Sequence, residues 1–373
     1  MSKKKLSRRN ILKTAGLFSA VGLLSACGDS GTPNKPGKAT TNLKKTFDWK
    51  MVTTWPKNFP GLGTGAQRLV DNIKIMSEGR LNIKLFAAGE LVPAFESFDA
   101  VRENKAQMFH ASPYYWINKN KSMPFFGAVP GGMIAQEHNA WINYGGGQKL
   151  WDDLYNEFGL KSFMAGNSGT QMGGWFLKKI NTKEDFKGLK MRIPGLAAEV
   201  LNRMGGTAVA LPGGEIMPAL QSGAIDATEW VGPWNDLAFG FYKITKFYYG
   251  PGIHEPSSVL ECSINLEAYN SLPVDLKSIV RIACEAENSR MISEFTAANS
   301  DAQQKLVNKH NVEVLNFPKE VFKAMIKISD EVVAETAGEG KINREIFDSW
   351  ISFKKLARLR SPFAEQGFIN LSS

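Results

Sequence analysis

Strand-like and helix-like segments alternate along the chain from Phe47 to about Pro273, and this alternation limits the fold most strongly. Runs of alternating or continuous apolar residues predict strands, and apolar residues at helical spacing predict helices. The predicted strands cover 47–55, 81–88, 107–112, 160–166 and 224–230, and the predicted helices cover 63–78, 95–106 and 197–204. The alternation predicts an α/β fold with parallel-type sheets covered by helices, followed by a mostly helical region up to Leu356.

A short motif occurs twice in this pattern. The stretch GELVPAF at 89–95 recurs as GEIMPAL at 214–220, and each copy is followed by a helical stretch and a strand. A chance match of so short a motif is the alternative. A true repeat predicts two lobes that share one supersecondary unit, with residues 110–116 facing Glu229 and Trp230 across a cleft, where ligands of α/β proteins commonly bind.

The charge distribution argues against a nucleic-acid partner. The 373 residues allow two domains of about 100–200 residues each. The formal net charge is +9, but the first 46 residues hold ten of the 45 basic and one of the 36 acidic residues, which leaves 35 of each in the rest. Because the body of the chain is neutral, a face that binds polyanions is not expected.

The N-terminus has the pattern of an export signal. A twin-arginine motif, SRRNILK at 7–13, precedes an apolar stretch at 15–24 that is too short to span a bilayer. The sequence LSAC at 24–27 resembles a bacterial lipobox. We therefore predict a Tat-type lipoprotein signal at 1–26 and a lipid on Cys27, with a plain export signal and an incidental cysteine as the alternative.

The segment 27–46 is predicted to be a flexible tether, because it is rich in Gly, Pro, Thr and Lys. Several acyl chains on Cys27 anchor a protein durably to a membrane. The expected location is therefore extracytoplasmic or periplasmic, at the inner or the outer membrane. Of the other two cysteines, Cys262 lies in an apolar strand-like run, which favours buried free thiols for Cys262 and Cys284 over a disulfide.

Motifs for catalysis are weak. The stretch GLGTGA at 61–66 fits a dinucleotide fingerprint, but Pro56 and Pro60 separate it from the preceding strand, so a loop that caps a helix is the better interpretation. No HExxH motif or GxSxG elbow occurs, and the histidines show no ligand-like clustering: His110, His138, His254 and His310. The sequence predicts a protein that is not an enzyme.

Two polar residues stand where apolar ones are expected. Gln171 lies between flexible glycines before a Trp-Phe strand, where it either binds a ligand or satisfies backbone groups. Arg192 alternates with Met191 and Ile193 in a strand that ends at Pro194. An exposed arginine on an edge strand is one interpretation, and a guanidinium that grips a carboxylate through two parallel hydrogen bonds is the other.

Two acidic residues suggest an ion site. Glu229 follows a strand-like run, and a carboxylate at a buried strand end must be paired, hydrogen-bonded or metal-bound. Glu255, just before a proline and an apolar strand, is the second candidate ligand. The alternative is that Glu255 is a solvated acid in a loop. Two carboxylates, an amide oxygen and a backbone carbonyl form an oxygen-only site that suits Ca²⁺ or Na⁺, and counting charges does not decide between them.

Taken together, these residues resemble the solute-binding subunits of TRAP transporters, the DctP-like family, and most closely the group that binds 2-oxo and 2-hydroxy carboxylates. The resemblance covers nearly all of residues 47–365. The segments that carry it are TTWP, GELVPAFE, TQMGGWF, KGLKMRIPG, LPGGEIMPALQSGAIDATEWVGP and GPGIHEP. It implies a two-lobed periplasmic-binding-protein-like fold at 47–365, with the ligand cleft between the lobes, a helical C-terminal region and a tail at 366–373.

The resemblance also implies roles for individual residues. Arg192 matches the arginine that binds the substrate carboxylate, and Tyr115 is the aromatic residue expected to line the cleft. The implied metal ligands are the side chains of Gln171, Glu229 and Glu255 and the main-chain carbonyl of Trp230, with Gln171 also touching the substrate. Ligand oxygens complete the coordination of Ca²⁺ or Na⁺.

The predicted function is the capture of a small monocarboxylate, a 2-oxo acid such as pyruvate or else lactate, and its delivery to the TRAP membrane permease. Members of the group can form homodimers by exchanging C-terminal helices, which stays open for this chain. Two other functions remain as alternatives at this stage: a metal-dependent periplasmic hydrolase, and a ligand-sensing lipoprotein that docks to a receptor.

Overall fold

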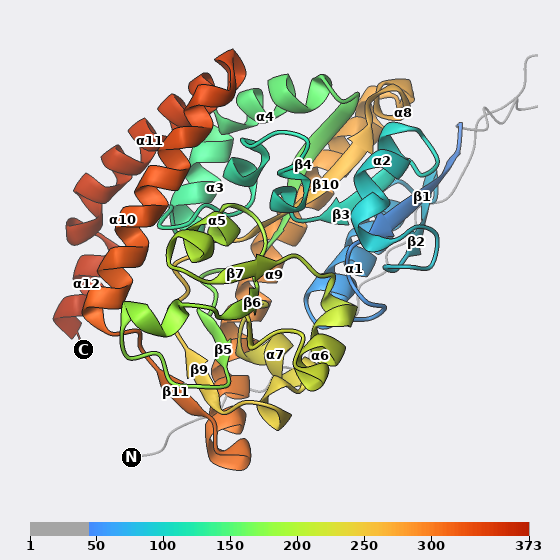
Figure 1. Cartoon of the computed structure of the whole chain (residues 1–373). Coiled ribbons are helices and arrows are strands. Elements are labelled where there is room, and N and C mark those ends of the chain that lie inside the picture. The colour runs from blue at the N-terminus through green and yellow to red at the C-terminus, as the bar shows by residue number, and fades with distance from the viewer. Residues whose placement is uncertain (1–44, 373) are drawn as a thin grey trace, which may run out of the picture. The chain divides into compact units, whose positions relative to one another are not determined.

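The computed structural model describes residues 45–372. The predicted signal at 1–26, the lipid site at Cys27 and nearly all of the predicted tether lie outside the described residues. Within 45–372, no helix combines the length and the apolar character that crossing a bilayer requires. The described chain forms two β-sheets with helices packed around them, as the alternating pattern of the sequence predicts (Figure 1).

The first sheet has five strands in the order β2-β1-β3-β10-β4. The strands are β1 (Phe47–Thr53), β2 (Leu81–Phe86), β3 (Met108–Ala111), β4 (Leu160–Asn167) and β10 (Val259–Asn265). β1 pairs in parallel with both β2 and β3, whereas β10 runs antiparallel to β3 and β4. Alternate residues of β1 point into the core, so Trp49 and Met51 are buried while Asp48 and Lys50 are exposed.

The second sheet has six strands in the order β11-β9-β5-β8-β6-β7. These strands are β5 (Gly174–Phe176), β6 (Lys190–Arg192), β7 (Thr207–Val209), β8 (Ala227–Thr228), β9 (Phe247–Tyr249) and β11 (Glu313–Leu315). β6 pairs in parallel with β7 and β8, and β5 runs antiparallel to β8 and β9. The strand predicted at 224–230 is much shorter than expected, because only the two residues of β8 pair in the sheet.

The two sheets contain the same supersecondary unit, as the repeated motif predicts. In one unit the strands lie in the order β2-β1-β3 and in the other β7-β6-β8, with the first strand of each unit in the middle and all pairs parallel. The two copies of the motif occupy corresponding places, just before β3 and just before β8. Their local structures differ, since 214–220 lies inside α6 (Gly213–Ser222) and 89–95 is mostly a turn before the short helix η1 (Ala94–Glu96).

Two chain segments connect the sheets next to the place where the units end. The first crossover, residues 168–173, leads from β4 to β5, and the second crossover, residues 250–258, leads from β9 to β10. The crossovers bind each other, because Gln171 donates its backbone N–H to the Glu255 carbonyl at 3.0 Å and Gly252 donates to the Gln171 carbonyl at 2.8 Å. Residues on the two crossovers are therefore held side by side.

The C-terminal part is helical, as predicted. The 37-residue helix α9 (Val274–His310) packs against β4 of the first sheet and against α7 (Pro233–Phe239), which follows β8 of the second. It is followed by α10 (Lys319–Glu335), α11 (Lys341–Arg360) and α12 (Glu365–Ser372). Residues 366–372, predicted to be a tail, are thus part of a helix.

The remaining helices cover the sheets and connect the strands. They are α1 (Leu62–Met76), α2 (Ser97–Arg102), α3 (Ala135–Tyr144), α4 (Gly147–Asn156), α5 (Leu196–Arg203) and α8 (Leu266–Ser271), with the 3₁₀ turns η2 (Pro113–Trp116), η3 (Met123–Phe126), η4 (Lys183–Phe186), η5 (Phe241–Lys243), η6 (Thr336–Glu339) and η7 (Ser361–Phe363). The stretch at 61–66 caps and starts α1, as predicted, and Gly63 is required there because a Cβ would lie 2.8 Å from the Pro56 carbonyl oxygen.

The two cysteines outside the signal are buried free thiols, as predicted. Cys262 on β10 and Cys284 on α9 belong to one hydrophobic cluster between the first sheet and the helices behind it. The pKa of the Cys262 thiol is raised well above its usual value, by the hydrogen bond with Cys284 and by burial. Both thiols therefore act as small apolar side chains of this core.

Candidate ion and carboxylate site

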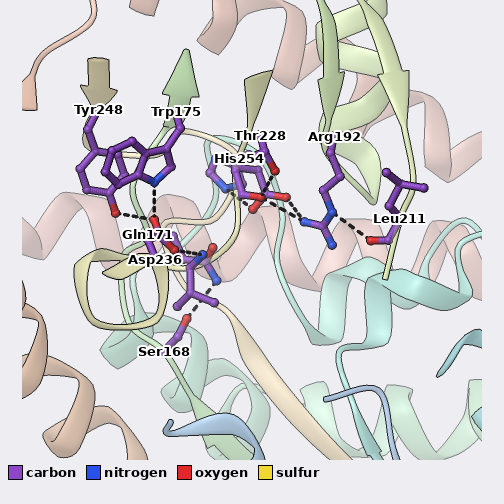
Figure 2. A network of polar contacts seen from close by, with 11 residues as sticks. Ser168, Gln171, Trp175, Arg192, Leu211, Thr228, Asp236, Tyr248 and His254 are labelled. Carbon is purple, nitrogen blue, oxygen red and sulfur yellow. Dashed lines mark hydrogen bonds and ion pairs between the residues drawn. The ribbon is translucent and has the colours of Figure 1, made fainter. Parts of the chain in front are cut away.

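A buried ion pair lies where the second unit ends. Arg192 is the last residue of β6, and Glu229 directly follows β8, the neighbouring parallel strand, so the register of the sheet places them side by side. Arg192 Nη1 donates to Glu229 Oε1, and Arg192 Nε donates to the Leu211 carbonyl at 3.1 Å (Figure 2). The exposed fractions of the Arg192 and Glu229 side chains are 1% and 0%.

The burial of Arg192 contradicts one of the two interpretations of its sequence. β6 lies between β8 and β7 and is not an edge strand, and the guanidinium is enclosed. Burial lowers the pKa of Arg192, but the Glu229 carboxylate together with Tyr115 and Tyr114 outweighs it, and the pKa is raised. Removing either member of a buried pair of this kind leaves the other charge uncompensated in a poorly solvated place, which is strongly destabilising.

The second crossover adds His254 and Glu255 to this pair. His254 Nε2 lies 3.3 Å from Glu229 Oε2, close enough for an ion pair when the imidazole is protonated. Glu255 is 3% exposed, so the interpretation as a solvated loop acid is wrong. Burial, together with the nearby Glu229 carboxylate, raises the pKa of Glu255 to about 7. Within residues 45–372, one group of three acidic or histidine side chains could hold a metal ion: Glu229, His254 and Glu255, whose ligand atoms lie within 4.8 Å of one another.

His254 is the residue that the sequence analysis missed at this site. Burial lowers the pKa of its imidazole, but the Glu229 carboxylate raises it more, and the net pKa is raised. Its neighbour Glu255 was already a candidate, so the adjacent His-Glu pair was the signal that could have identified it. Its partner Glu229 is 25 positions away in the chain, and the contact depends on the second crossover.

The first crossover brings Gln171 to the same place. Its main chain binds the second crossover on both sides, and its Nε2 donates to Ser168 Oγ at 3.1 Å. The bonds to the second crossover are thus made by its main chain, and the hydrogen bond of its side chain goes to a hydroxyl and not to a backbone group. Its Oε1, however, is buried and has no hydrogen-bond partner among the described residues, so it can serve as a ligand atom as well.

Buried polar atoms without partners gather around these residues. Within 45–372, the acceptor oxygens Gln171 Oε1, Glu229 Oε2 and Glu255 Oε2 form no hydrogen bond, and neither do the donors Arg192 Nη2 and Trp230 Nε1. Unpaired buried polar groups are rare in native proteins and call for an explanation. Oxygen acceptors of this kind fit a hard cation such as Ca²⁺ or Na⁺, and unpaired donors fit an anion, so the residues present suit both groups.

Aromatic residues from the first unit close the other side. A small cavity is lined by Gln171 and Trp230 from the charged side and by Trp55, Tyr114 and Tyr115 from the loops that follow β1 and β3. Burial raises the pKa of Tyr115 to about 12, and the pKa of Tyr114 is also well above its usual value. The predicted meeting of residues 110–116 with Trp230 is therefore seen for Tyr114 and Tyr115.

His110, at the start of that segment, does not face the cavity. It is fully buried in β3, where its Nδ1 accepts from Trp55 Nε1 at 2.8 Å and its Nε2 lies 3.1 Å from the Ala165 carbonyl oxygen. Burial lowers the pKa of the His110 imidazole to about 4, so the ring is neutral at physiological pH. Its role is to hold the Trp55 indole in place by accepting this hydrogen bond.

Comparison with known proteins shows the family to which the chain belongs. Residues 51–339 match the model of the family described as bacterial extracellular solute-binding protein, family 7 (DctP). The chain belongs to this family. It is a TRAP solute-binding protein of the two-lobed α/β type, and its place is outside the cytoplasm.

Three relatives are similar over most of their length. A monocarboxylate 2-oxoacid-binding periplasmic protein of Nostoc is 38% identical over 368 residues, which are 99% of each chain. A TRAP solute-binding protein of Pseudoalteromonas atlantica, solved with sodium and pyruvate, is 40% identical with a TM-score of 0.85 and covers 87% of this chain and 99% of its own. The protein of Colwellia psychrerythraea, solved with calcium and pyruvate, is 41% identical, also with a TM-score of 0.85, over 87% of this chain and 99% of its own.

Proposed function

We propose that this protein captures a small 2-oxo monocarboxylate, such as pyruvate, outside the cytoplasm and delivers it to the membrane permease of a TRAP transporter. The observation that carries the proposal is the joint burial of acceptor oxygens without a hydrogen bond on Gln171, Glu229 and Glu255 beside Arg192 Nη2, a donor without a hydrogen bond. Of these acceptors, Glu229 Oε2 faces His254 Nε2 at 3.3 Å. A site with these two kinds of atom can bind a cation and a carboxylate together. Similar proteins solved with pyruvate and a cation support the same ligand class.

The residues proposed to hold the cation are Gln171, Glu229 and Glu255, through side-chain oxygens, and Trp230, through its main-chain carbonyl. When bound, Ca²⁺ or Na⁺ supplies positive charge that offsets the buried carboxylates and attracts oxygens of the substrate. With a divalent ion, Arg192, two ionised glutamates and a monocarboxylate sum to neutrality, and with sodium they leave one negative charge. Protonation of His254 adds one positive charge, with which sodium gives the neutral sum instead, so charge does not decide between the two cations.

Arg192 is proposed to bind the substrate carboxylate. Its Nη1 and Nε are used by Glu229 and Leu211, which fixes the plane of the guanidinium and leaves Nη2 as the unpaired donor. Pre-organised donors cost little entropy when the ligand arrives. Tyr115 is proposed to form part of the wall on the opposite side of the cavity, together with Tyr114.

The test is a calorimetric and thermal-shift screen of the purified mature protein against pyruvate, 2-oxobutyrate, lactate and succinate, each with Ca²⁺, with Na⁺ and with a chelator. A ligand that binds the native state must raise the melting temperature. We expect pyruvate and its close analogues to bind and to depend on the cation, and succinate, a dicarboxylate, to fail. Binding of none of the monocarboxylates would contradict the proposal.

The proposed function excludes turnover of the bound acid. The expected result is that pyruvate incubated with the protein at equal concentration keeps its proton NMR spectrum and is recovered unchanged. Appearance of a product would favour the metal-dependent hydrolase or another enzyme. The same experiment separates a carrier from an enzyme without reference to transport.

Export and anchoring form a separate part of the proposal. We propose that residues 1–26 direct export through the twin-arginine route, that a lipid on Cys27 anchors the protein, and that 27–46 tether the two-lobed domain at 47–365. Mass spectrometry of the membrane-extracted protein should find acyl chains on an N-terminal Cys27, and Cys27→Ala should release the protein from the membrane. A soluble wild-type protein would contradict the anchor alone.

The last two helices favour a homodimer. Large apolar side chains are exposed along α11, η7 and α12, with exposed fractions of 66% to 91%: Leu356, Leu359, Phe363, Phe368 and Leu371. An apolar face of this kind usually marks an interface. We propose that a second copy of this chain covers it. Analytical ultracentrifugation should find a dimer for the wild type and a monomer for the double variant Phe363→Ser with Leu371→Ser.

A further inference from the structure

A second buried carboxylate, Asp236, lies beside the candidate site without facing its cavity. It is 1% exposed and belongs to α7, and none of its hydrogen-bond partners is a positively charged side chain. Its Oδ2 accepts from Trp175 Nε1 at 2.9 Å and from the Tyr248 hydroxyl at 2.6 Å, and its Oδ1 accepts from the backbone N–H of Val231 at 3.3 Å (Figure 2). Each carboxylate oxygen therefore has a donor of its own.

The hydrogen bond to Val231 fixes the direction of the preceding carbonyl. The Trp230 carbonyl and the Val231 N–H belong to the same planar peptide unit, which is trans, so the two groups point in opposite directions. Because Asp236 holds the N–H toward itself, the Trp230 carbonyl must point away from Asp236. Within residues 45–372 no backbone hydrogen bond to the Trp230 carbonyl oxygen is found. The next carbonyl, of Val231, accepts from Met172 N–H at 3.1 Å and so faces the first crossover.

Trp175 and Tyr248 hold Asp236 in this position. They lie directly opposite each other on β5 and β9, the strand that follows the first crossover and the strand that precedes the second. Their rings stack with centroids 4.0 Å apart, and both polar ends meet at Asp236 Oδ2. Burial raises the pKa of Asp236 to about 7, while its hydrogen bonds oppose this rise.

We infer that Asp236 is a positioning residue that aims the Trp230 carbonyl at the cation held by Gln171, Glu229 and Glu255. This inference rests on the proposed function, because it needs a cation at those residues. Asp236 does not touch the ion or the substrate. It acts through the orientation of one peptide unit, and Trp175 and Tyr248 keep its carboxylate from turning. Residues that orient metal ligands in this way typically change metal affinity about 10- to 100-fold when they are replaced.

The carboxylate chemistry of Asp236 gives a rescue experiment. In Asp236→Asn, the side chain has one acceptor oxygen and one NH₂ donor, so it cannot accept from both the Trp175 indole and the Val231 N–H. In Trp175→Phe with Asp236→Asn, the indole donor is gone, the NH₂ group can donate to the Tyr248 hydroxyl oxygen, and the acceptor is free for Val231. Trp175→Phe alone leaves the Asp236–Val231 bond in place and is the matched control.

The measurement is calorimetric titration of each variant with CaCl₂ at pH 8, without substrate, after chelator treatment and with circular dichroism to check folding. We expect Asp236→Asn to bind Ca²⁺ about 10- to 100-fold more weakly than the wild type, and the double variant to regain most of the affinity. Wild-type Ca²⁺ affinity in Asp236→Asn would overturn the inference and leave the proposed function intact.

If Asp236→Asn and the double variant bind Ca²⁺ equally weakly, the inference is also overturned. That result would indicate a general loss of packing, because removing a further buried group, the Trp175 indole, cannot restore packing. Failure of the wild type to bind Ca²⁺ or, in a parallel titration, Na⁺ would instead contradict the cation part of the proposed function, and with it this inference. If Asp236→Asn does not fold, the double variant is compared with Trp175→Phe. Ca²⁺ affinity at least tenfold weaker in the double variant than in Trp175→Phe would then count against the role of Asp236.

Discussion

The two units built from β1–β3 and from β6–β8 have the same strand order but end in different chemistry. After β1 and β3 the first unit presents Trp55, Tyr114 and Tyr115, which are neutral at physiological pH. After β6 and β8 the second unit presents Arg192 and Glu229, which form a buried ion pair. The shared topology decides where a ligand can sit, and the residues at the strand ends decide what holds it.

The buried glutamate of the first sheet and the glutamates of the charged site also differ, in how completely their oxygens are hydrogen-bonded. Glu261 on β10 of the first sheet accepts from Trp116 Nε1 at 2.6 Å with one oxygen and from Ser263 Oγ at 2.7 Å with the other. Glu229 and Glu255 each keep one oxygen without a hydrogen bond. A carboxylate whose partners are complete serves the fold, whereas unpaired oxygens mark the side on which a cation can bind.

Replacing the arginine of the charged unit should have the largest effect. Arg192→Met removes the guanidinium that pairs with the buried Glu229 and leaves only His254 beside it, so we expect a loss of about 3 kcal/mol in the free energy of unfolding. Pyruvate affinity should fall at least about 30-fold, because a buried charged donor is lost. Chemical denaturation and calorimetry measure both, with Lys190→Met, an exposed position on the same strand, as the control. Pyruvate binding at wild-type strength would remove Arg192 from the site.

Glu261 of the first sheet should affect stability and its pH dependence, but not ligand binding. Burial raises the pKa of Glu261 to about 7, above its ordinary value of 4.5, so its contribution is complete below pH 4.5 and is lost as the pH rises through 7. Glu261→Gln does not titrate. We therefore expect its stability relative to the wild type to rise by roughly 3 kcal/mol between pH 4 and pH 8. Denaturation curves at both pH values test this, and a constant difference would contradict it.

Replacing Glu255 of the second crossover should weaken ligand binding, unlike replacing Glu261. In Glu255→Gln a neutral amide replaces the carboxylate, so we expect Ca²⁺ affinity to fall about 10- to 100-fold. Pyruvate affinity should fall only when Ca²⁺ is present, because the two ligands are linked. Titration of pyruvate with and without Ca²⁺ separates these effects, and Glu261→Gln serves as the control. An equal loss of affinity in both variants would erase the distinction between Glu255 and Glu261.

The aromatic wall of the first unit should have the smallest effect. Tyr115→Phe keeps the ring that lines the cavity and removes a hydroxyl, so we expect pyruvate affinity to change by no more than about 1 kcal/mol, or about fivefold. Ca²⁺ affinity should be unchanged, since the proposed cation ligands come from the other side. A large loss of Ca²⁺ binding in Tyr115→Phe would show that the first unit also holds the ion.

Much of this arrangement could be predicted from sequence, because local patterns carry it. Alternating strands and helices indicated the α/β fold, and the repeated motif indicated two units of the same topology. The resemblance to a known family identified Arg192, Glu229 and Glu255, and all three are buried together. The short β8 was not predicted, because Ala224 and Ile225 have strand-like character while the chain there is still leaving the turn after α6.

What the sequence could not provide are contacts made by the two crossovers and by cross-strand pairs. His254 reaches Glu229 only because the second crossover lies beside β8, and Asp236 meets Trp175 and Tyr248 because β5 pairs with β9. These contacts join residues 12 to 61 positions apart, which no local period reveals. Asp236 in particular looks like an ordinary acidic residue in the first turn of a helix.

The central claim is that one buried site holds a cation and a carboxylate together, and their thermodynamic coupling tests it most directly. Pyruvate is titrated into the chelator-treated protein and into the protein saturated with Ca²⁺, and Ca²⁺ is titrated with and without pyruvate, with a parallel set in Na⁺. The account predicts that one of these cations raises pyruvate affinity at least about tenfold and that pyruvate raises the affinity for that cation by the same factor. Independent binding, with affinities unchanged by the other ligand for both cations, would contradict it.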